Sequence, residues 1–207
     1  MIVYGSAVSP FVRKVLVFIA EKGLMTEHLP LRFHDPSPEF QAVSPTGKIP
    51  GFSDGDYRLA DSSAIVQYIE RKYPNPSLLP QDAESLGRAI WFDEYADTIL
   101  FGAAGTVFAN LVVRPKVLGL PCDMAAVEKA TSEELPVIYD YLQSQISGRY
   151  LVGEAFSLAD IAVASPFVNL AMCGHKLDAS KWPMLAAFVD GVLARDSFQK
   201  ARDPKRG

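Results

Sequence analysis

Ser9 begins the segment whose residue types are best placed to do chemistry. It precedes Pro10, and the pair suits the N-cap and first position of a helix, where a missing proline N–H costs nothing. Serine is among the commonest caps, so capping alone is the simpler interpretation. A hydroxyl at a helix N-terminus can also hydrogen-bond a thiolate, because the helix dipole favours negative charge there. The segment therefore predicts either a cap or a thiolate site.

Lys48-Ile49-Pro50 is a second candidate, because it lies between a turn and an expected edge strand. A cis peptide bond before Pro50 would turn the backbone N–H and C=O of Ile49 outward. A peptide-like ligand could then pair with them as an added strand does. Lys48 by itself indicates only a solvated surface charge. The segment predicts a place for a peptide-like ligand if the bond is cis.

Asp61-Ser62 is the third candidate, at an expected junction of a strand with a helix. Either residue suits an N-cap, so capping is again the simpler interpretation. Free N–H groups at a helix start also form a carboxylate site, where Ser62 adds a donor and Asp61 can hold an ammonium. One position would then recognise both charges of an α-amino acid end group.

The elements that must position these residues follow an alternating strand and helix pattern up to about residue 73, which indicates an α/β domain. The order is strand, helix, strand, helix, hairpin, helix, so Ser9 and Ser62 each stand at the start of a helix. The turn of the expected hairpin is Asp54-Gly55. The expected strands are Met1 to Tyr4, Leu29 to Phe33, Ile49 to Ser53 and Tyr57 to Leu59.

A proline-rich stretch over residues 74–83 cannot continue a helix and predicts a linker. Beyond it, residues 84–207 carry only helical patterns, several of them apolar on more than one side. We therefore expect an α/β domain over residues 1–73 and an all-helical domain over residues 84–207. The expected helices of that second domain are Ser85 to Val113, Met124 to Ile146, Leu158 to Met172 and Met184 to Ala194.

Composition bounds the class of protein. The formal net charge of −4 and the pI near 5.4 leave no basic excess for gripping nucleic acid phosphates. The longest nearly apolar runs, Leu100 to Val113 and Ile161 to Gly174, are shorter than the roughly 20 residues of a membrane span. The N-terminus lacks a basic region followed by a long apolar stretch, so no signal peptide is expected. These features predict a cytoplasmic protein that binds neither nucleic acid nor membrane.

The remaining polar residues predict no further chemistry. The three histidines, His28, His34 and His175, are too dispersed for a metal site of known spacing, so no metal is expected. Cys122 and Cys173 permit at most one disulfide and suit a reducing compartment.

The order and spacing of the three candidates resemble the glutathione S-transferase superfamily over nearly the whole chain. In that superfamily a thioredoxin-like domain carries a Ser, Cys or Tyr near its first helix, then a cis-proline, then an acidic-Ser or Gln-Ser pair. Ser9, Pro50 and Asp61-Ser62 match these positions. The Ser-Pro-Phe segment with its following arginine is most similar to the serine-type classes, particularly the plant tau class and related bacterial proteins. Asp61 stands where those relatives usually have glutamate.

The helical half carries the same resemblance. The segment from Gly153 to Asp160 is similar to the family's buried capping box, in which Ser157 caps a helix and Asp160 caps in return. Pro166 lies inside the helix that follows and predicts a kink there.

The resemblance implies the glutathione S-transferase fold, with an α/β thioredoxin-like N-terminal domain and an all-α C-terminal domain. It implies a glutathione transferase, with a detoxification role, in which Ser9 stabilises the thiolate of the cosubstrate glutathione for attack on a small hydrophobic electrophile. It also implies a homodimer. The residues expected to bind glutathione are Lys48, Ile49, Pro50, Asp61 and Ser62, and those expected to line an electrophile pocket between the domains are Phe11, Tyr95, Phe101 and Phe108.

Two other classes of function compete with this interpretation. The fold could serve as a non-catalytic binding or protein-interaction module, which turnover of a generic electrophile would argue against. It could instead support thiol–disulfide exchange, but Ser9 occupies the position where that chemistry needs a cysteine.

Overall fold

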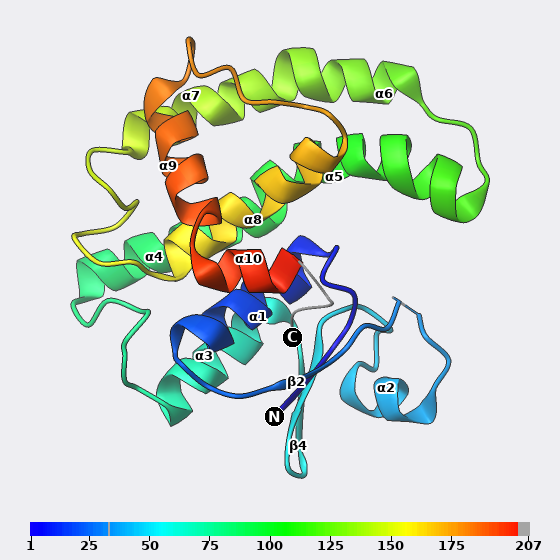
Figure 1. Cartoon of the computed structure of the whole chain (residues 1–207), viewed down its shortest axis with the longest axis vertical. Helices are drawn as coiled ribbons and strands as arrows, with labels where there is room; N and C mark the ends of the chain where they lie inside the picture. The colour runs from blue at the N-terminus through cyan, green and yellow to red at the C-terminus, as the bar shows by residue number, and fades with distance from the viewer. Residues whose placement is uncertain (33, 203–207) are drawn as a thin grey trace. The chain divides into compact units, whose positions relative to one another are not determined.

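The computed structural model describes residues 1–32 and 34–202, and it divides the chain into two compact units (Figure 1). The first unit contains Met1–Pro80 together with a C-terminal segment that begins at Ala194. The second unit is Gln81–Leu193. The two units are described separately below.

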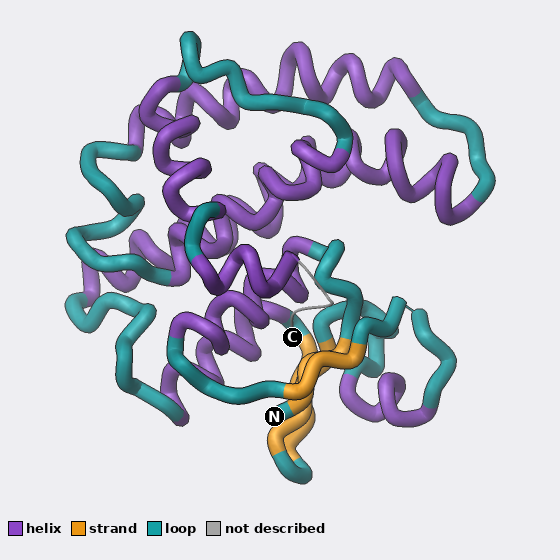
Figure 2. Tube along the Cα trace, in the orientation of Figure 1, coloured by secondary structure: helices purple, strands orange, loops and turns teal. Residues whose placement is uncertain are grey.

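A four-stranded mixed sheet, seen as the orange strands of Figure 2, forms the centre of the first unit. Its strand order is β2-β1-β3-β4, in which β1 pairs parallel with β2 and antiparallel with β3. The hairpin joins β3 to β4 around Gly55, which has the positive φ of 60° that such tight turns require. The strands are β1 (Ile2–Tyr4), β2 (Glu27–Leu29), β3 (Gly51–Asp54) and β4 (Tyr57–Ala60).

Helices cover both faces of this sheet. Helices α1 (Pro10–Glu21) and α3 (Ser62–Lys72) pack against each other on one side, and α2 (Pro38–Val43) lies on the other (Figure 1). The buried face of α1 follows the expected helical spacing, and Gly23 follows its C-terminal end with a φ of 67°. Tyr4 of β1 packs with buried side chains of α2, which fixes the sheet beneath the loop that carries Ser9.

The second strand was expected at the wrong residues. Strand β2 ends at Leu29, where a strand from residue 29 to residue 33 was expected. Pro30 follows and has no N–H to give to the sheet, while the N–H of Leu31 turns back to the Leu29 carbonyl at 2.8 Å. Phe33 lies outside the described residues.

The second unit is all-helical throughout its described residues, 81–193. Its first helical stretch runs continuously from Ala83 to Leu118 and includes two π-helical segments. Helix α8 is the core of the unit, because every residue from Leu158 to Leu170 is buried and α4, α5 and α9 pack against it. The elements are α4 (Ala83–Tyr95), η1 (Ala96–Leu100), α5 (Phe101–Phe108), η2 (Ala109–Leu118), α6 (Met124–Lys129), η3 (Ala130–Glu134), α7 (Leu135–Gln145), α8 (Leu158–Met172) and α9 (Pro183–Leu193).

The predicted capping box is present at the start of α8. Asp160 accepts hydrogen bonds from the N–H of Leu151 at 2.9 Å and of Ser157 at 2.8 Å, and the Ser157 hydroxyl adds a third at 3.3 Å. Burial raises the pKa of Asp160 to about 6, although these donors act in the opposite direction. The motif is a folding element of the second unit, as its sequence suggested.

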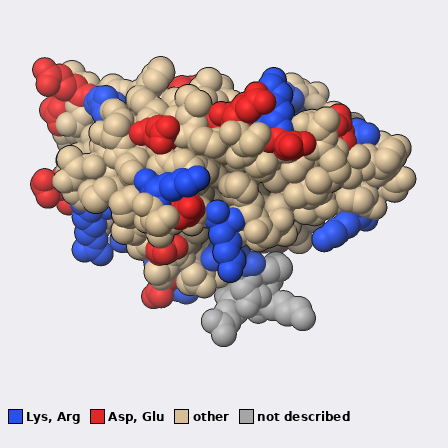
Figure 3. Space-filling model, turned by 90° about the horizontal axis from the view of Figure 1, so that it is seen from above, with Lys and Arg blue, Asp and Glu red and all other residues tan. Residues whose placement is uncertain are grey.

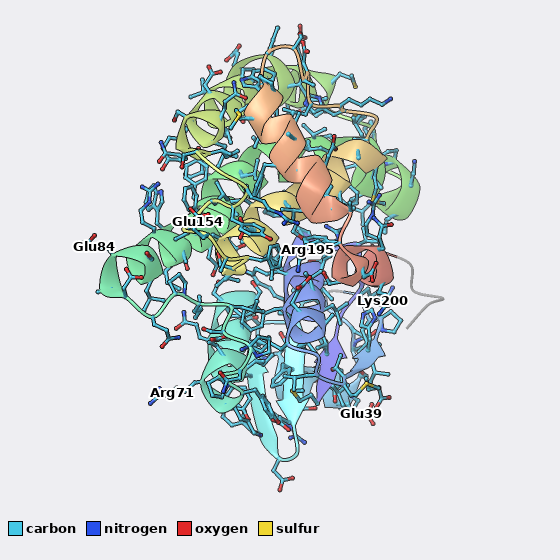
Figure 4. The ribbon with its side chains drawn as sticks, turned by 60° about the vertical axis from the view of Figure 1, so that its left-hand side comes forward. Glu39, Arg71, Glu84, Glu154, Arg195 and Lys200 are labelled. Atoms are coloured by element: carbon cyan, nitrogen blue, oxygen red, sulfur yellow. The ribbon has the colours of Figure 1, made fainter. Side chains whose placement is uncertain are left out.

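The C-terminal helix α10 (Asp196–Arg202) departs from the expected domain division. Residues 84–207 were expected to form one helical domain, yet α10 packs on α1 within the first unit. Arg195, which Figure 4 shows at the start of α10, forms two hydrogen bonds with the Glu21 carboxylate of α1, at 2.8 and 2.6 Å. The Ser197 hydroxyl donates to the same carboxylate. The ion pair between Arg195 and Glu21 therefore attaches α10 to α1 within the first unit.

The helical stretch Ala83–Leu118 is 36 residues long and, by length and composition alone, apolar enough to cross a membrane. The sequence predicted one helix from Ser85 to Val113 and, within it, a nearly apolar run from Leu100 to Val113 that is shorter than a span; the helix of the structure is longer at both ends. This signal is weak, since core helices of soluble proteins pass the same test. A third of the apolar window is buried, and the buried residues of the whole stretch include Phe92, Leu100 and Val107.

Candidate functional site

Ser9 is the N-cap of α1, as its sequence context predicted. Its backbone is extended, with φ −66° and ψ 128°, and its hydroxyl oxygen accepts a long hydrogen bond of 3.5 Å from the Val12 N–H. The side chain is half-buried, so it remains accessible from solvent. A cap bond of this length holds the hydroxyl weakly, and the hydroxyl proton is available to another acceptor. The geometry is compatible with a cap that also donates to an anion at the start of α1.

The loop between β1 and α1 is packed tightly against Ile49 through Gly5. Gly5 has a φ of 132°, and a Cβ atom there would lie 2.7 Å from Ile49 Cβ and 2.8 Å from Val12 Cγ2. The Gly5 carbonyl also lies 2.7 Å from His28 Nε2 of β2. Only a glycine permits this approach, which places the Ser9 loop beside the segment that contains the second candidate.

The Ile49–Pro50 peptide bond is cis, and Pro50 is buried. The carbonyl oxygen of Lys48 accepts a 2.6 Å hydrogen bond from the buried Ser44 hydroxyl, while the Lys48 side chain is exposed. The backbone before Pro50 is thus held by Gly5 on one side and by Ser44 on the other. This arrangement can present Ile49 to an extended peptide.

Asp61 is the N-cap of α3 and has an unusual backbone conformation, with φ 79° and ψ 126°. Its Oδ1 atom accepts a 3.0 Å hydrogen bond from the Ala64 N–H. Asp61 is exposed, whereas the neighbouring Ser62 is only 3% exposed. A non-glycine residue at positive φ is strained, and such strain is concentrated at functional sites. The start of α3 therefore offers backbone N–H groups and a buried hydroxyl to an anion.

Two cations on α1 are buried, which the sequence did not predict for either of them. Lys14 is 1% exposed, and its ammonium donates to the Ser63 hydroxyl in the first turn of α3 at 3.2 Å. Arg13 is equally buried and donates to the carbonyl of Val8, the residue before Ser9, at 3.0 Å. Burial, with a smaller effect from the positive charge of Arg202, lowers the pKa of Arg13 to about 9. Lys14 thus links α1 to the first turn of α3, and Arg13 holds the loop that leads to Ser9.

A polar hollow of about 440 Å³ lies beside Lys48 in the first unit and was also missed. Its walls come from the segment before α2, from α2 itself and from the turn before the cis-proline. The sequence marked Pro45-Thr46-Gly47 only as a turn, and the spacing of His34 from the other histidines argued only against a metal. The lining residues are His34, Asp35, Gln41, Ser44, Pro45, Thr46 and Gly47.

The residues expected to line an electrophile pocket are divided between the two units. Phe11 lies on α1 of the first unit, while Tyr95, Phe101 and Phe108 lie on the first helical stretch of the second. All four are half-buried. The Tyr95 ring packs at 4.9 Å from Tyr141 within the second unit. A pocket that combines the two sets stays a prediction.

The part of the chain that is described has no candidate metal site, and its charged side chains do not indicate a second binding site. Within residues 1–32 and 34–202, no group of three His, Cys, Asp or Glu side chains is close enough to hold a metal ion. Acidic and basic side chains are mixed over the face shown in Figure 3. The chemistry therefore concentrates at the N-terminal ends of α1 and α3 and at the cis-proline.

Comparison with known proteins finds a matching family model for each of the two units. The family model described as "Glutathione S-transferase, N-terminal domain" matches residues 3–77, and that described as "Glutathione S-transferase, C-terminal domain" matches residues 114–196. Glutathione S-transferase 3 of Zea mays is 34% identical over 204 residues, covering 95% of this chain and 90% of that protein. A glutathione S-transferase of Hyoscyamus muticus is 32% identical, covering 100% and 99%.

Solved structures give the same result. A glutathione S-transferase-I bound with lactoylglutathione has a TM-score of 0.86 at 26% identity and covers 97% of each chain. A maize glutathione S-transferase I in complex with an atrazine glutathione conjugate has a TM-score of 0.83 at 28% identity, covering 97% of this chain and 95% of that chain. The similarity extends over both units, and the expected fold class is confirmed.

Proposed function

The chain belongs to the glutathione S-transferase family and is a glutathione transferase with glutathione as its cosubstrate, and we propose that Ser9 stabilises the thiolate. The observation that carries this proposal is the accessible Ser9 hydroxyl, held by only one long cap bond at the N-terminus of α1. The relatives do not favour a non-catalytic module. The narrower resemblance to the tau class stays a prediction.

The Ser9 hydroxyl acts as a hydrogen-bond donor and keeps its own proton. The glutathione thiol begins with a pKa near the cysteine value of about 8.5, so only a few per cent is thiolate at neutral pH. A hydrogen bond to a charged group contributes roughly 1.5–3 kcal/mol, which lowers the thiol pKa by about one to two units. The thiolate then attacks the electrophile directly.

The rest of the tripeptide is assigned to the other two candidates and the hollow. The backbone of Ile49 before the cis-proline pairs with the cysteinyl residue as a short added strand. The γ-glutamyl end lies at the start of α3, with its carboxylate at Ser62 and its ammonium beside Asp61. The glycyl carboxylate points toward the hollow beside Lys48 and His34, where the Lys48 ammonium gives it a positive partner.

Small hydrophobic electrophiles are the proposed second substrates, and Phe11, Tyr95, Phe101 and Phe108 are the proposed walls of their pocket. We further propose a cytoplasmic homodimer that does not associate with membrane, on the basis of the family resemblance. Sedimentation equilibrium of the purified chain tests the oligomeric state. A mass of one chain across the micromolar range would contradict the dimer.

Replacing Ser9 with alanine tests the central proposal. The Ser9→Ala variant should conjugate glutathione about 10- to 100-fold more slowly at neutral pH, and its pH–rate profile should shift upward by about one to two pH units. Ser6→Ala is the matched control, because Ser6 lies in the same loop and its hydroxyl oxygen only accepts from the Val8 N–H. An unchanged profile for Ser9→Ala, with several electrophiles, would remove Ser9 from the mechanism.

A further inference from the structure

The hollow beside Lys48 is larger than the glycyl end of glutathione that points toward it. Its volume of about 440 Å³ falls within the roughly 300–1,000 Å³ of sites that enclose a whole small molecule. A glycyl residue, by contrast, has no side chain and ends in a single carboxylate. In the proposed function that carboxylate pairs with the exposed Lys48 side chain, and Lys48 is not among the described residues that line the hollow. The glycyl end alone would therefore leave most of the volume unfilled.

The rim of the hollow is held in a fixed conformation by His34 and Gly47. The His34 N–H donates to the Gly47 carbonyl at 2.6 Å, and the two residues have positive φ angles of 55° and 69°. The imidazole lies directly against Gly47, because a Cβ atom there would collide with His34 Nδ1. A positive φ is uncommon outside glycine, and such angles are concentrated at ligand sites. The hollow is thus a preformed part of the first unit.

The charge of the lining is acidic. Asp35 is the only acidic residue among the described residues of the lining, and no lysine or arginine is among them. Its Oδ1 atom accepts a 3.0 Å hydrogen bond from the Ser37 N–H. The hydrogen bonding of Ser37, and to a smaller extent the positive charge of Arg32, lower the pKa of Asp35, so this carboxylate is ionised at neutral pH. The hollow therefore favours a cation over an anion.

Hydrogen bonds within the fold already use donors of two neutral side chains in the lining. The Ser44 hydroxyl donates its proton to the Lys48 carbonyl at 2.6 Å, and the Gln41 amide donates to the Pro36 carbonyl at 3.2 Å. The oxygen atoms of these two side chains can still accept, and the Thr46 hydroxyl can donate or accept. An ammonium group has three donors and a carboxylate has none. The lining therefore suits a ligand that donates.

From these observations we propose that the enzyme also uses glutathione derivatives extended at the glycyl end by an amide that carries an alkylammonium group, as a polyamine amide does, with the ammonium bound by Asp35 in the hollow. This inference rests on the proposed placement of the glycyl end. Forming the amide removes the glycyl carboxylate and its pair with Lys48, which is exposed and worth no more than about fivefold. The pair with half-buried Asp35 recovers a similar amount.

Two amides of equal length test the charge. They join the glycyl carboxyl of glutathione to 1,4-diaminobutane, which leaves an ammonium, or to 4-aminobutanol, which leaves a neutral hydroxyl. With the full-length enzyme and one electrophile, kcat/KM for the ammonium amide should lie within about fivefold of glutathione and exceed that of the hydroxyl amide by about two- to fivefold. The S-methyl forms of both amides should show the same ratio as competitive inhibitors, which separates binding from chemistry.

Asp35→Asn locates the cause. It removes the charge but keeps an oxygen for the Ser37 N–H, so the preference for the ammonium amide over the hydroxyl amide should disappear. Glutathione, whose carboxylate no longer faces that of Asp35, should be used no less well. Asp56→Asn is the matched control, because Asp56 is exposed in the turn between β3 and β4 and its substitution removes the same charge. This control should keep the preference.

The outcomes distinguish the inference from the proposed function. If the unmodified enzyme used the two amides equally well, or if Asp35→Asn kept the preference, the ammonium would not be bound by Asp35. The inference would then be wrong, while the placement of glutathione itself would stand. If both amides reacted more than about tenfold more slowly than glutathione, the glycyl end would not open onto the hollow. Its proposed placement would then fail together with the inference, and the role of Ser9 would still be decided by the pH–rate profile of Ser9→Ala.

Discussion

Helices α1 and α3 have accessible capping residues at their N-terminal ends and a buried ion pair near their C-terminal ends. At their N-terminal ends stand Ser9 and Asp61, each accessible and each with one cap bond, of 3.5 and 3.0 Å. Near their C-terminal ends, Lys22 and Glu70 form a buried ion pair of 2.6 Å, with the Lys22 side chain fully buried. The N-terminal ends are open to a ligand, and the C-terminal ends are closed around a charge pair.

At the closed end, both members of the ion pair also form hydrogen bonds with other groups. The Lys22 ammonium also donates to the carbonyls of Tyr73 and Pro76, both at 2.7 Å. Glu70 accepts from the Ser77 hydroxyl at 2.8 Å and from the Leu78 N–H at 3.3 Å. A cation at the C-terminal end of a helix is favoured by the dipole, just as an anion is at the N-terminal end. The same two helices thus fasten the following linker at one end, and in the proposed function they hold an anionic ligand at the other.

Lys22→Met should break the closed end and leave the open end intact. The substitution keeps much of the side-chain volume but leaves Glu70 buried without its counter-charge, so unfolding in urea should require about 3–5 kcal/mol less free energy. The pH–rate profile and the KM for glutathione of the folded fraction should not change. This is the largest effect that we expect from a single substitution in the first unit.

Lys72→Met is the matched control for that experiment. Lys72 pairs with Asp54, but its side chain is 41% exposed, so its loss should cost no more than about 1 kcal/mol. The double variant Lys22→Met with Glu70→Leu should recover most of the stability, because it removes both buried charges. Equal losses for Lys22→Met and Lys72→Met would show that the buried pair has no special role.

The sequence predicted the open end better than the closed end, and the physical reason is the range of the interactions. Ser9 and Asp61 cap helices through N–H groups three residues away, so their role can be read from a short segment. Lys22 and Glu70 meet only because α1 and α3 pack side by side, which neither segment shows by itself. Long-range pairs of this kind carry no local pattern.

The two departures in the fold have different causes, one long-range and one local. The place of α10 depends on Arg195 meeting Glu21, which lies far away in the sequence. The end of β2 depends on Pro30, which has no N–H for the sheet and so ends the strand despite the apolar residues that follow. The positive φ of Asp61 was not expected either, although aspartate adopts such angles more often than most residues other than glycine.

Gly5→Ala should break the open end with a smaller effect on the fold. The new Cβ would meet Ile49 and Val12 at less than 3 Å, so the loop that carries Ser9 and the backbone before Pro50 must move apart. We expect a loss of about 1–3 kcal/mol in unfolding free energy and a raised KM for glutathione. Steady-state kinetics and urea unfolding of one preparation measure both quantities.

Gly23→Ala is the corresponding change at the closed end of α1. Gly23 also has a positive φ, of 67°, but a Cβ there would meet nothing within 4 Å. The substitution should cost about 1 kcal/mol of backbone strain and leave the KM unchanged. If Gly23→Ala raised the KM as much as Gly5→Ala does, close packing against Ile49 would not be what positions the site.

Glu21 sharpens the comparison through pH, because a carboxylate at the C-terminal end of α1 opposes the dipole and depends on its partners. Burial raises the pKa of Glu21, but the hydrogen bonds from Arg195 and Ser197 outweigh burial and hold the pKa below its ordinary value. A lowered carboxyl pKa adds stability above the unfolded value of about 4.3, and that stability is lost as the pH falls through the folded pKa. Because the Arg195 side chain is 29% exposed, we expect the ion pair to contribute only about 1 kcal/mol of stability at pH 7.

The unfolding free energy of the unmodified chain should therefore exceed that of Glu21→Gln at pH 7, and the difference should shrink toward zero in acid. A difference that persists below pH 3 would mean that α10 is held on α1 by packing, with no help from the charge of Glu21.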